Sequence, residues 1–386
     1  MAENKEKKVL NVPNLRFPEF EGEWEEHYLS DYLDFKNGLN PKPERFGKGI
    51  KFISVMDILN NAVITNDCIR ASVDVSEEEL LSFCVENGDI LFQRSSETLE
   101  DVGRANVYMD NKPAVFGGFV IRGKKKAEYD PLFFRYLLAS PFARKKIIPM
   151  GAGAQHFNIG QEGLNKVKLH FALLDEQKKI ARLLSLLDER IATQNKIIED
   201  LQSLIKGIAQ HWIKNITSRS IYVKLGDICQ ITTGKLDANA QVDNGVYPFF
   251  TCAEHPFKID SFAFDTEALL ISGNGANLGY INYYNGKFNA YQRTYVLDLF
   301  SENIQYIKWV LKVLLPKRIA IEKSSSNTPY ILLSTLSDLM LPIPSKENQY
   351  HIAELMQSLE RKLSSQITLN GSYNILKQYL LRQMFI

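Results

Sequence analysis

The chain has 386 residues, of which 45% are hydrophobic and 24% are charged, and its formal net charge is +1. These values are typical of a soluble globular protein that is long enough for two domains, each with its own core. A near-neutral charge neither requires nor excludes nucleic acid as a partner, because binding depends on where the basic residues cluster.

The hydrophobic pattern argues against a membrane protein and against a secreted one. No apolar run approaches the ~20 residues that cross a bilayer, and Met1–Lys8 are charged and polar with no apolar stretch behind them. The four cysteines lie far apart without the spacing of a metal site, so we expect reduced thiols; they are Cys68, Cys84, Cys229 and Cys252. We therefore expect a cytoplasmic protein with no membrane contact.

The first part of the chain, from Val9 to Phe171, alternates short β-rich runs with turn signals. Strands are expected at 49–55, 89–93 and 119–122, and a short helix at 131–138. This mixture predicts an α+β domain with a mostly antiparallel, curved sheet.

A long helix is expected from Leu174, with Asp175 and Glu176 in its first turn, where they complement the helix dipole. Apolar positions then follow 4-3 spacing for more than four heptads, which is the signature of a coiled coil. We call these positions the seam; they are Ile180, Leu184, Leu187, Ile191, Gln194, Ile198, Leu201, Ile205, Ile208 and Trp212. Leu183, Ile197 and Leu204 lie off the seam and indicate a second interface.

A second β-rich part follows from Ile221 to Ile343, with strands expected at 247–251, 268–272 and 291–297 and a short helix at 304–315. A second long helix comes next. Its seam positions are Ile352, Met356, Leu359, Leu363, Gln366 and Leu380, and its distal half is weakened by Asn370, Tyr373 and Lys377. A helix of about 40 residues is ~60 Å long.

The two halves repeat each other. Gln177–Leu183 falls on Gln349–Leu355 without gaps, at an offset of 172, and a long internal repeat outweighs residue-level guesses about the fold. We therefore predict an α+β fold: two tandem, pseudo-symmetric α/β domains separated by two long antiparallel coiled-coil helices. The expected boundaries are 1–172, 173–215, 216–344 and 345–386.

Motifs for catalysis are weak. Gly273–Gly279 resembles a nucleotide-binding glycine loop, but strand and turn signals follow at 280–286, so the helix that such a site needs is missing. Asn327–Tyr330 is close to the Asn-Pro-Pro-Tyr motif of amino-methyltransferases but lacks its first proline. No Walker lysine, His/Cys metal cluster or paired acid and base is evident, so no catalytic residue and no metal site is predicted.

Matched basic and polar segments in both halves favour a nucleic-acid surface over ordinary solvated loops. Glycine and serine allow close approach to a polyanion, and Gln, Asn and Arg side chains read base edges. The candidate DNA-binding residues are Lys42, Arg45, Lys48, Arg94, Ser95, Arg104, Gln155, His156, Asn158, Thr233, Lys235, Asn274, Gln292, Arg293, Ser325 and Asn327.

Taken together, the chain resembles the specificity subunit of a type I DNA restriction-modification enzyme. The resemblance covers nearly the whole chain and depends on the opening Pro13–Trp24, on Leu29–Asp31 with its copy Leu225–Ile228, and on the phrase Leu173–Ala181 with its copy Pro342–Ala353. The second phrase departs by having Asn348 at the place of Glu176.

The resemblance implies that each domain reads one half of an interrupted double-stranded DNA target, while the helix pair sets the spacer between the halves. It also implies two methyltransferase subunits docked on the helices, with restriction/translocase subunits added to them. The chain itself would hold no cofactor; S-adenosylmethionine, ATP and Mg²⁺ would be bound by the partners.

Two other classes of function are left open. A self-contained DNA methyltransferase or nuclease would turn over when purified alone. A coiled-coil scaffold without DNA contacts would show no DNA binding that weakens with salt.

Overall fold

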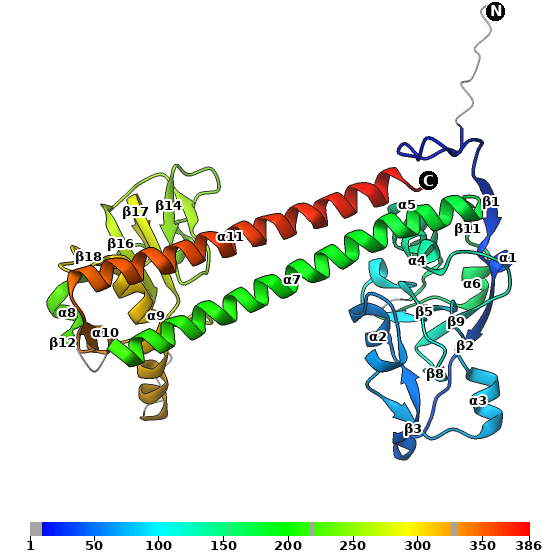
Figure 1. Ribbon diagram of the computed structural model, residues 1–386, viewed down its shortest axis with the longest axis horizontal. Helices are drawn as coiled ribbons and strands as arrows, with labels where there is room; N and C mark the ends of the chain where they lie inside the picture. The colour runs from blue at the N-terminus through cyan, green and yellow to red at the C-terminus, as the bar shows by residue number, and fades with distance from the viewer. Residues whose placement is uncertain (1–9, 154, 217–219, 326–329) are drawn as a thin grey trace, which may run out of the picture. The chain divides into compact units, whose positions relative to one another are not determined.

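The computed structural model describes residues 10–153, 155–216, 220–325 and 330–386. The chain divides into two compact units, Met1–Asn195 with Leu369–Ile386, and Lys196–Thr368. Each unit contains an α+β domain and one end of each long helix, α7 (Leu174–Ile216) and α11 (Lys346–Gln383) (Figure 1). The predicted fold class is confirmed: helices and strands are mixed, the domain occurs twice, and two long helices are present.

The first unit is built on a four-stranded antiparallel sheet with the order β2-β9-β5-β7 and a three-stranded sheet with the order β4-β3-β8, in which β3 and β8 are parallel. Two small sheets, β1-β11 and β6-β10, complete it. The strands are β1 (Glu25–Tyr28), β2 (Leu33–Asn37), β3 (Phe46–Ile53), β4 (Ser72–Val73), β5 (Ile90–Gln93), β6 (Ser95–Ser96), β7 (Ala105–Val107), β8 (Ala114–Phe116), β9 (Val120–Lys125), β10 (Phe157–Asn158) and β11 (Lys168–Phe171). The helices are α1 (Leu29–Tyr32), α2 (Val55–Asn60), α3 (Glu77–Phe83), α4 (Pro131–Ala139), α5 (Pro141–Ile147) and α6 (Gln161–Asn165).

The second unit has one six-stranded sheet with the order β13-β18-β16-β17-β14-β15 and a small sheet, β12-β19. All of these pairs are antiparallel except β14 with β17. The strands are β12 (Ile221–Lys224), β13 (Gln230–Thr233), β14 (Tyr247–Phe250), β15 (Phe257–Ile259), β16 (Phe264–Ser272), β17 (Ile281–Ala290), β18 (Thr294–Asp298) and β19 (Met340–Ile343). The helices are α8 (Leu225–Ile228), α9 (Ile304–Ser325) and α10 (Leu333–Ser337).

Several expected boundaries are wrong. Val55 begins α2 and does not end a strand, and residues 291–293 form a turn before β18. No turn occurs at Gly286, because this glycine adopts φ 130° and lets β17 continue to Ala290 beside β16. The helix expected to end at residue 315 continues through Pro316 to Ser325, since a proline removes one backbone donor without always ending a helix.

Within the first unit the N-terminal end of α7 packs against the C-terminal end of α11, so the two helices run antiparallel. Ile180, Leu184 and Leu187 on α7 join the same apolar cluster as Leu380 and Met384, at and just beyond the end of α11. The weak, polar part of the second seam is satisfied by polar partners on α7. Asn370 donates to Asn195 (2.8 Å), Arg190 donates to the hydroxyl of Tyr373 (3.3 Å), and Lys377 pairs with Asp188 (2.5 Å).

Within the second unit the other ends of the same helices share a cluster centred on Ile205, Ala209, Met356 and Trp309 of α9. Leu201, Ile352, Leu359 and Leu363 pack around it. In each unit the seam side chains are buried or half-buried, and the off-seam Ile197 and Leu204 are exposed as expected. The off-seam Leu183 is instead half-buried and packs against the core of the first unit. Gln194 is buried and Gln366 half-buried.

A buried glutamine braces each α+β domain against its long helix. Gln177 accepts a hydrogen bond from the backbone N–H of Asp130 (3.0 Å) and donates to the carbonyl of Ala172 (2.8 Å). Gln349 does the same with Asn303 (3.0 Å) and Pro344 (3.0 Å). Asp130 and Asn303 also cap α4 and α9 with their side chains, so each helix start is fixed twice.

A second repeated contact is an ion pair between domain and helix. Arg135 of α4 pairs with Asp188 of α7 (3.3 Å), and the hydroxyl of Tyr136 donates to the same carboxylate (2.8 Å). At the equivalent place, Lys308 of α9 pairs with Glu360 of α11 (2.6 Å). The pKa of Lys308 is lowered, first by burial, and the adjacent Glu360 opposes that shift.

Candidate nucleic-acid interface

In the first unit, two distant segments are joined by the short pair β6-β10. Asn158 lies opposite Ser95, and their side chains are hydrogen-bonded. The backbone N–H of Ile159 donates to the carbonyl of Arg94 (2.9 Å). Ala152 and Asn158 pair with each other through two backbone hydrogen bonds, and Gln155 and His156, which lie between them in the chain, are exposed.

The second unit reproduces this arrangement with different side chains. Asn274 forms a bridge with Tyr330, and the N–H of Ile331 donates to the carbonyl of Gly273 (2.8 Å). Gly273 therefore stands where Arg94 stands in the first unit. We call the pairing at 94–95 with 158–159, and its copy at 273–274 with 330–331, the recognition frame.

A tight turn lies against each recognition frame. Gly117–Phe119 leads into β9, and its third residue accepts a hydrogen bond from the N–H of Arg94 (2.8 Å). Tyr291–Arg293 leads into β18, and its third residue accepts from the N–H of Gly273 (2.9 Å). Both turns close with a hydrogen bond of 2.8 Å from the following residue back to the first. Phe119 and Arg293 are thus equivalent.

The frame of the second unit borders a hollow of about 240 Å³. Thr233, Gln292 and Arg293, which were predicted from the sequence, line it together with Gly273 and Tyr330. Asn274 and Lys235 lie within two residues of this lining in the chain, and Lys235 is exposed. Amide, hydroxyl and guanidinium groups meet here, and these groups suit phosphate oxygens and base edges.

The first unit gathers fewer of the predicted residues. Arg94, Ser95 and Asn158 meet at the frame, with Gln155 and His156 on the adjoining loop. Arg94 also donates to the carbonyl of Gly118 (3.2 Å), which fixes its side chain beside the turn.

The segment 42–48 has a different environment. Arg45 forms a bidentate pair with Glu79 of α3, and this contact lowers the pKa of Glu79 to about 2. Lys48 pairs with Asp74 (3.2 Å), while Lys42 is exposed. Two of these three cations are therefore neutralised within the domain, which weakens them as phosphate contacts.

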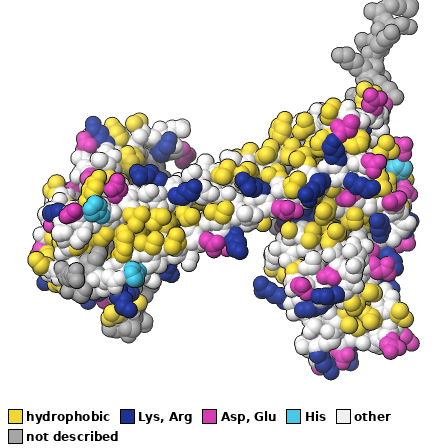
Figure 2. All heavy atoms as spheres, in the orientation of Figure 1, with side chains coloured by type: hydrophobic (Ala, Val, Ile, Leu, Met, Phe, Trp, Pro, Cys, Tyr) yellow, Lys and Arg dark blue, Asp and Glu magenta, His cyan; other side chains and the backbone are white. Residues whose placement is uncertain are grey.

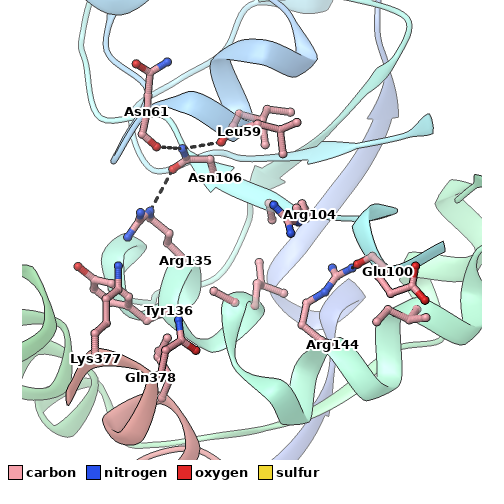
Figure 3. A pocket seen from close by; sticks show the side chains of 16 residues that line it. Leu59, Asn61, Glu100, Arg104, Asn106, Arg135, Tyr136, Arg144, Lys377 and Gln378 are labelled. Atoms are coloured by element: carbon pink, nitrogen blue, oxygen red, sulfur yellow. Dashed lines mark hydrogen bonds between the residues drawn. The ribbon is translucent and has the colours of Figure 1, made fainter. Parts of the chain in front are cut away.

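The carbonyl of Arg104 accepts a hydrogen bond from the backbone N–H of Gln93 (2.7 Å), next to the frame, and Arg104 lines a hollow of about 400 Å³ (Figure 3). It pairs with Asp101 (2.7 Å), and Arg135 and Arg144 line the same hollow. Arg144 donates to the carbonyls of Glu100 and Val102, and burial, with Arg104 nearby, lowers its pKa to about 10. Arg144 precedes the loop at 151–158 in the chain, but its guanidinium is bound to these carbonyls within the domain.

The remaining predicted residues lie at or beyond the edge of the described ranges. Asn327 and most of the motif 327–330 lie outside the described residues. Ser325 is the last residue of α9, and only its backbone is described. Phe119, Gln177 and Gln349 were not predicted from the sequence. The two glutamines could have been recognised, because the repeat aligns Gln177 with an identical residue at the constant offset of 172. The turn that carries Phe119 could not, because its residues differ between the two halves.

The described ranges contain no group of three or more His, Cys, Asp or Glu side chains placed to hold a metal ion. The four cysteines are unpaired, and burial raises the pKa of Cys229 to about 12. None of the described helices has both the length and the apolar character that crossing a bilayer requires.

The frame thus occurs twice, with equivalent backbone hydrogen bonds and different side chains, and each copy belongs to an α+β domain that is hydrogen-bonded to a long helix. The sequence pattern of the family described as type I restriction modification DNA specificity domain matches residues 21–203 and 220–370. The chain belongs to this family and carries its domain twice, which confirms the resemblance seen in the sequence.

Individual relatives agree. The chain is 43% identical over 143 residues to the type I restriction enzyme EcoDI specificity subunit of Escherichia coli, a match that covers 37% of this chain and 32% of that protein. It is 22% identical over 413 residues to the MjaVIII specificity subunit of Methanocaldococcus jannaschii, which covers 92% and 90% of the two chains. The matches to the EcoDI and MjaX subunits span only 32% and 48% of those relatives.

Two solved structures share the fold. The crystal structure of the S subunit of a type I restriction-modification system from M. genitalium superposes with a TM-score of 0.65 at 19% identity, covering 97% of this chain and 99% of that one. A structure from a study of assembly and conformational transition of a type I system gives a TM-score of 0.58 at 16% identity, covering 94% and 97%.

Proposed function

We propose that this chain is the DNA-reading subunit of a type I restriction-modification complex and performs no chemistry itself. Each α+β domain, bounded near 1–172 and 216–344, reads one half of a bipartite double-stranded target through its recognition frame. The helices at 173–215 and 345–386 set the length of the unread spacer, since two major-groove half-sites about one turn apart suit a rigid connection.

The repeated recognition frame carries this proposal. Its backbone hydrogen bonds are the same in both units, while Arg94, Ser95 and Asn158 are replaced by Gly273, Asn274 and Tyr330. A constant frame with changed side chains suits two surfaces that read different bases, because specificity comes from side chains on base edges.

We further propose that the exposed faces of the long helices bind two methyltransferase subunits, to which restriction/translocase subunits are added. Figure 2 shows hydrophobic side chains gathered along these helices. The exposed apolar residues are Leu186, Ile197 and Leu204 on α7, and Tyr350, Leu355, Ile367, Leu369, Ile375, Leu376 and Tyr379 on α11. Exposed apolar side chains in this number on two helices are typical of a surface that binds other proteins.

In this proposal S-adenosylmethionine, ATP and Mg²⁺ are bound by the partner subunits, and the complex acts in the cytoplasm, where the genomic DNA is. The partners methylate adenines at the chosen sites, or translocate and cut unmethylated DNA. A target base has to leave the duplex for methylation, so the reading domains also help to distort the DNA.

The test is to map methylated adenines across the genome of cells that express the chain with its methyltransferase partner. The expected result is one interrupted motif that is methylated only when both proteins are present. Methylation or cleavage by the purified chain alone would contradict the proposal in favour of a self-contained enzyme. No salt-sensitive DNA binding by the complex would favour a scaffold.

A further inference from the structure

Phe119 is the most exposed aromatic side chain among those described, at 68%. It occupies the third position of the turn Gly117–Phe119, between the buried strands β8 and β9. Phe116, directly before the turn, and Val120, directly after it, are fully buried. The exposure is therefore confined to the turn.

The backbone that presents Phe119 is held from several sides. Val120 donates to the carbonyl of Gly117 (2.8 Å), and Arg94 donates to the carbonyls of Phe119 and Gly118. A side chain at Gly117 would meet the ring of Phe52 at 2.7 Å. An aromatic group on so fixed a turn loses little freedom when it binds, which favours a contact role.

The surroundings of Phe119 are polar. Arg94 lies beside it, followed by Ser95 with its partner Asn158. The equivalent position in the second unit carries the exposed Arg293, on the edge of the hollow of about 240 Å³. The third position of the turn thus carries a guanidinium in one unit and a phenyl ring in the other.

We infer that Phe119 is a specificity-determining residue that packs on the 5-methyl group of a thymine in the half-site read by the first domain. This rests on the proposed function, in which the half-sites are read in the major groove. The thymine methyl is the apolar group that base pairs display there, and phenylalanine is one of the side chains that contact it. Arg94 binds a neighbouring phosphate, which positions the ring without reading sequence.

The experiment measures binding of the complex of the full chain with its methyltransferase partner to a duplex of about 40 base pairs carrying the mapped motif. The half-site of the first domain is the half that stays unchanged when residues 221–343 are exchanged. Each thymine of that half-site is replaced in turn by deoxyuridine, which removes only the methyl group. At one position the unaltered complex should lose about fourfold in affinity, the equivalent of one buried methyl.

Phe119→Ala should bind the unmodified duplex about tenfold more weakly and be indifferent to deoxyuridine at that position, with an unchanged salt dependence. Arg94→Gln should instead reduce the slope of log affinity against log salt concentration by about one, because one phosphate contact is lost. Phe119→Leu should keep part of the preference for thymine. The matched control is Phe142→Ala, which removes another exposed phenyl group of the same unit and should behave as the unaltered chain.

If Phe119→Ala binds the unmodified duplex as tightly as the unaltered complex does, the inference is overturned and the proposed function still stands. The same holds for a weaker Phe119→Ala that responds to every deoxyuridine as the unaltered chain does, since the ring would then act as a wedge between base pairs. If the Ala variant does not fold, Phe119→Leu and the deoxyuridine series on the unaltered complex decide. Failure of the unaltered complex to bind the duplex would refute the proposed function itself, and the inference with it.

Discussion

Replacing Gln177 by leucine tests whether the buried glutamine fixes the α+β domain to its long helix. The Gln177 side chain is 3% exposed and serves two backbone groups, the N–H of Asp130 and the carbonyl of Ala172. Leucine has a similar volume, so the main effect of Gln177→Leu is to leave both groups without a partner.

The expected cost follows from those two groups. Each unpaired buried polar group lowers the free energy of unfolding by about 1 to 3 kcal/mol. The additional apolar surface that leucine buries raises it by about 1 to 2 kcal/mol. Asp130 is only half-buried, so water partly replaces the lost bond at that end. We therefore expect local destabilisation of about 2 kcal/mol, which corresponds to roughly a 30-fold change in the opening equilibrium.

Native-state hydrogen exchange is the suitable assay, because a chain of two units need not unfold in a single transition. Exchange in the segment 130–139 should accelerate about 30-fold in Gln177→Leu, and segment 303–312 should respond in the same way to Gln349→Leu. The control is Gln202→Leu, an exposed position on α7. Acceleration of less than about threefold at 130–139 would show that the brace contributes little.

Three further predictions concern the seam, a surface ion pair and a close backbone approach. Leu187→Lys places a charge in the packed ends of the long helices and should abolish assembly with the methyltransferase subunits; a full-sized complex on gel filtration would contradict this. The folded-state pKa of Glu79, about 2, lies below its unfolded value of 4.5, so its contribution to stability is present above pH 4.5 and is lost as the pH falls towards 2. Arg45→Gln should bring that pKa back towards 4.5 in an NMR titration, and an unchanged value would show that Arg45 does not cause the shift. Gly38→Ala should destabilise the first unit by about 1 to 3 kcal/mol, because the new methyl group would collide with the backbone of Gly117. The control Gly207→Ala, in open space on α7, should stabilise the chain slightly. If both variants shift the unfolding temperature equally in a thermal scan, the steric argument is refuted.

The sequence predicts the elements whose signals are local and periodic. The 4-3 spacing predicts the long helices, and α7 begins at the expected Leu174. The repeat predicts two related α+β domains, and the internal match of Gln177 with Gln349 marks a contact that both units use. These features follow from spacing and repetition, which a single sequence contains.

The composition of the candidate interface could not be predicted in the same way. Arg45 and Arg104 look like free cations in the sequence, but Glu79 and Asp101 pair with them, and Glu79 lies on a separate helix. Phe119 has no pattern to mark it, because its exposure depends on a turn held by the distant Arg94. Tertiary pairing decides which polar or aromatic side chains are available to a ligand.

The most direct test of modular DNA reading is to exchange residues 221–343 for the corresponding unit of another family member and to map the methylated motif again. If each domain reads its own half-site, one half of the motif changes, and the other half and the spacer between them stay as they were. A motif altered in both halves would show that the two domains do not read independently.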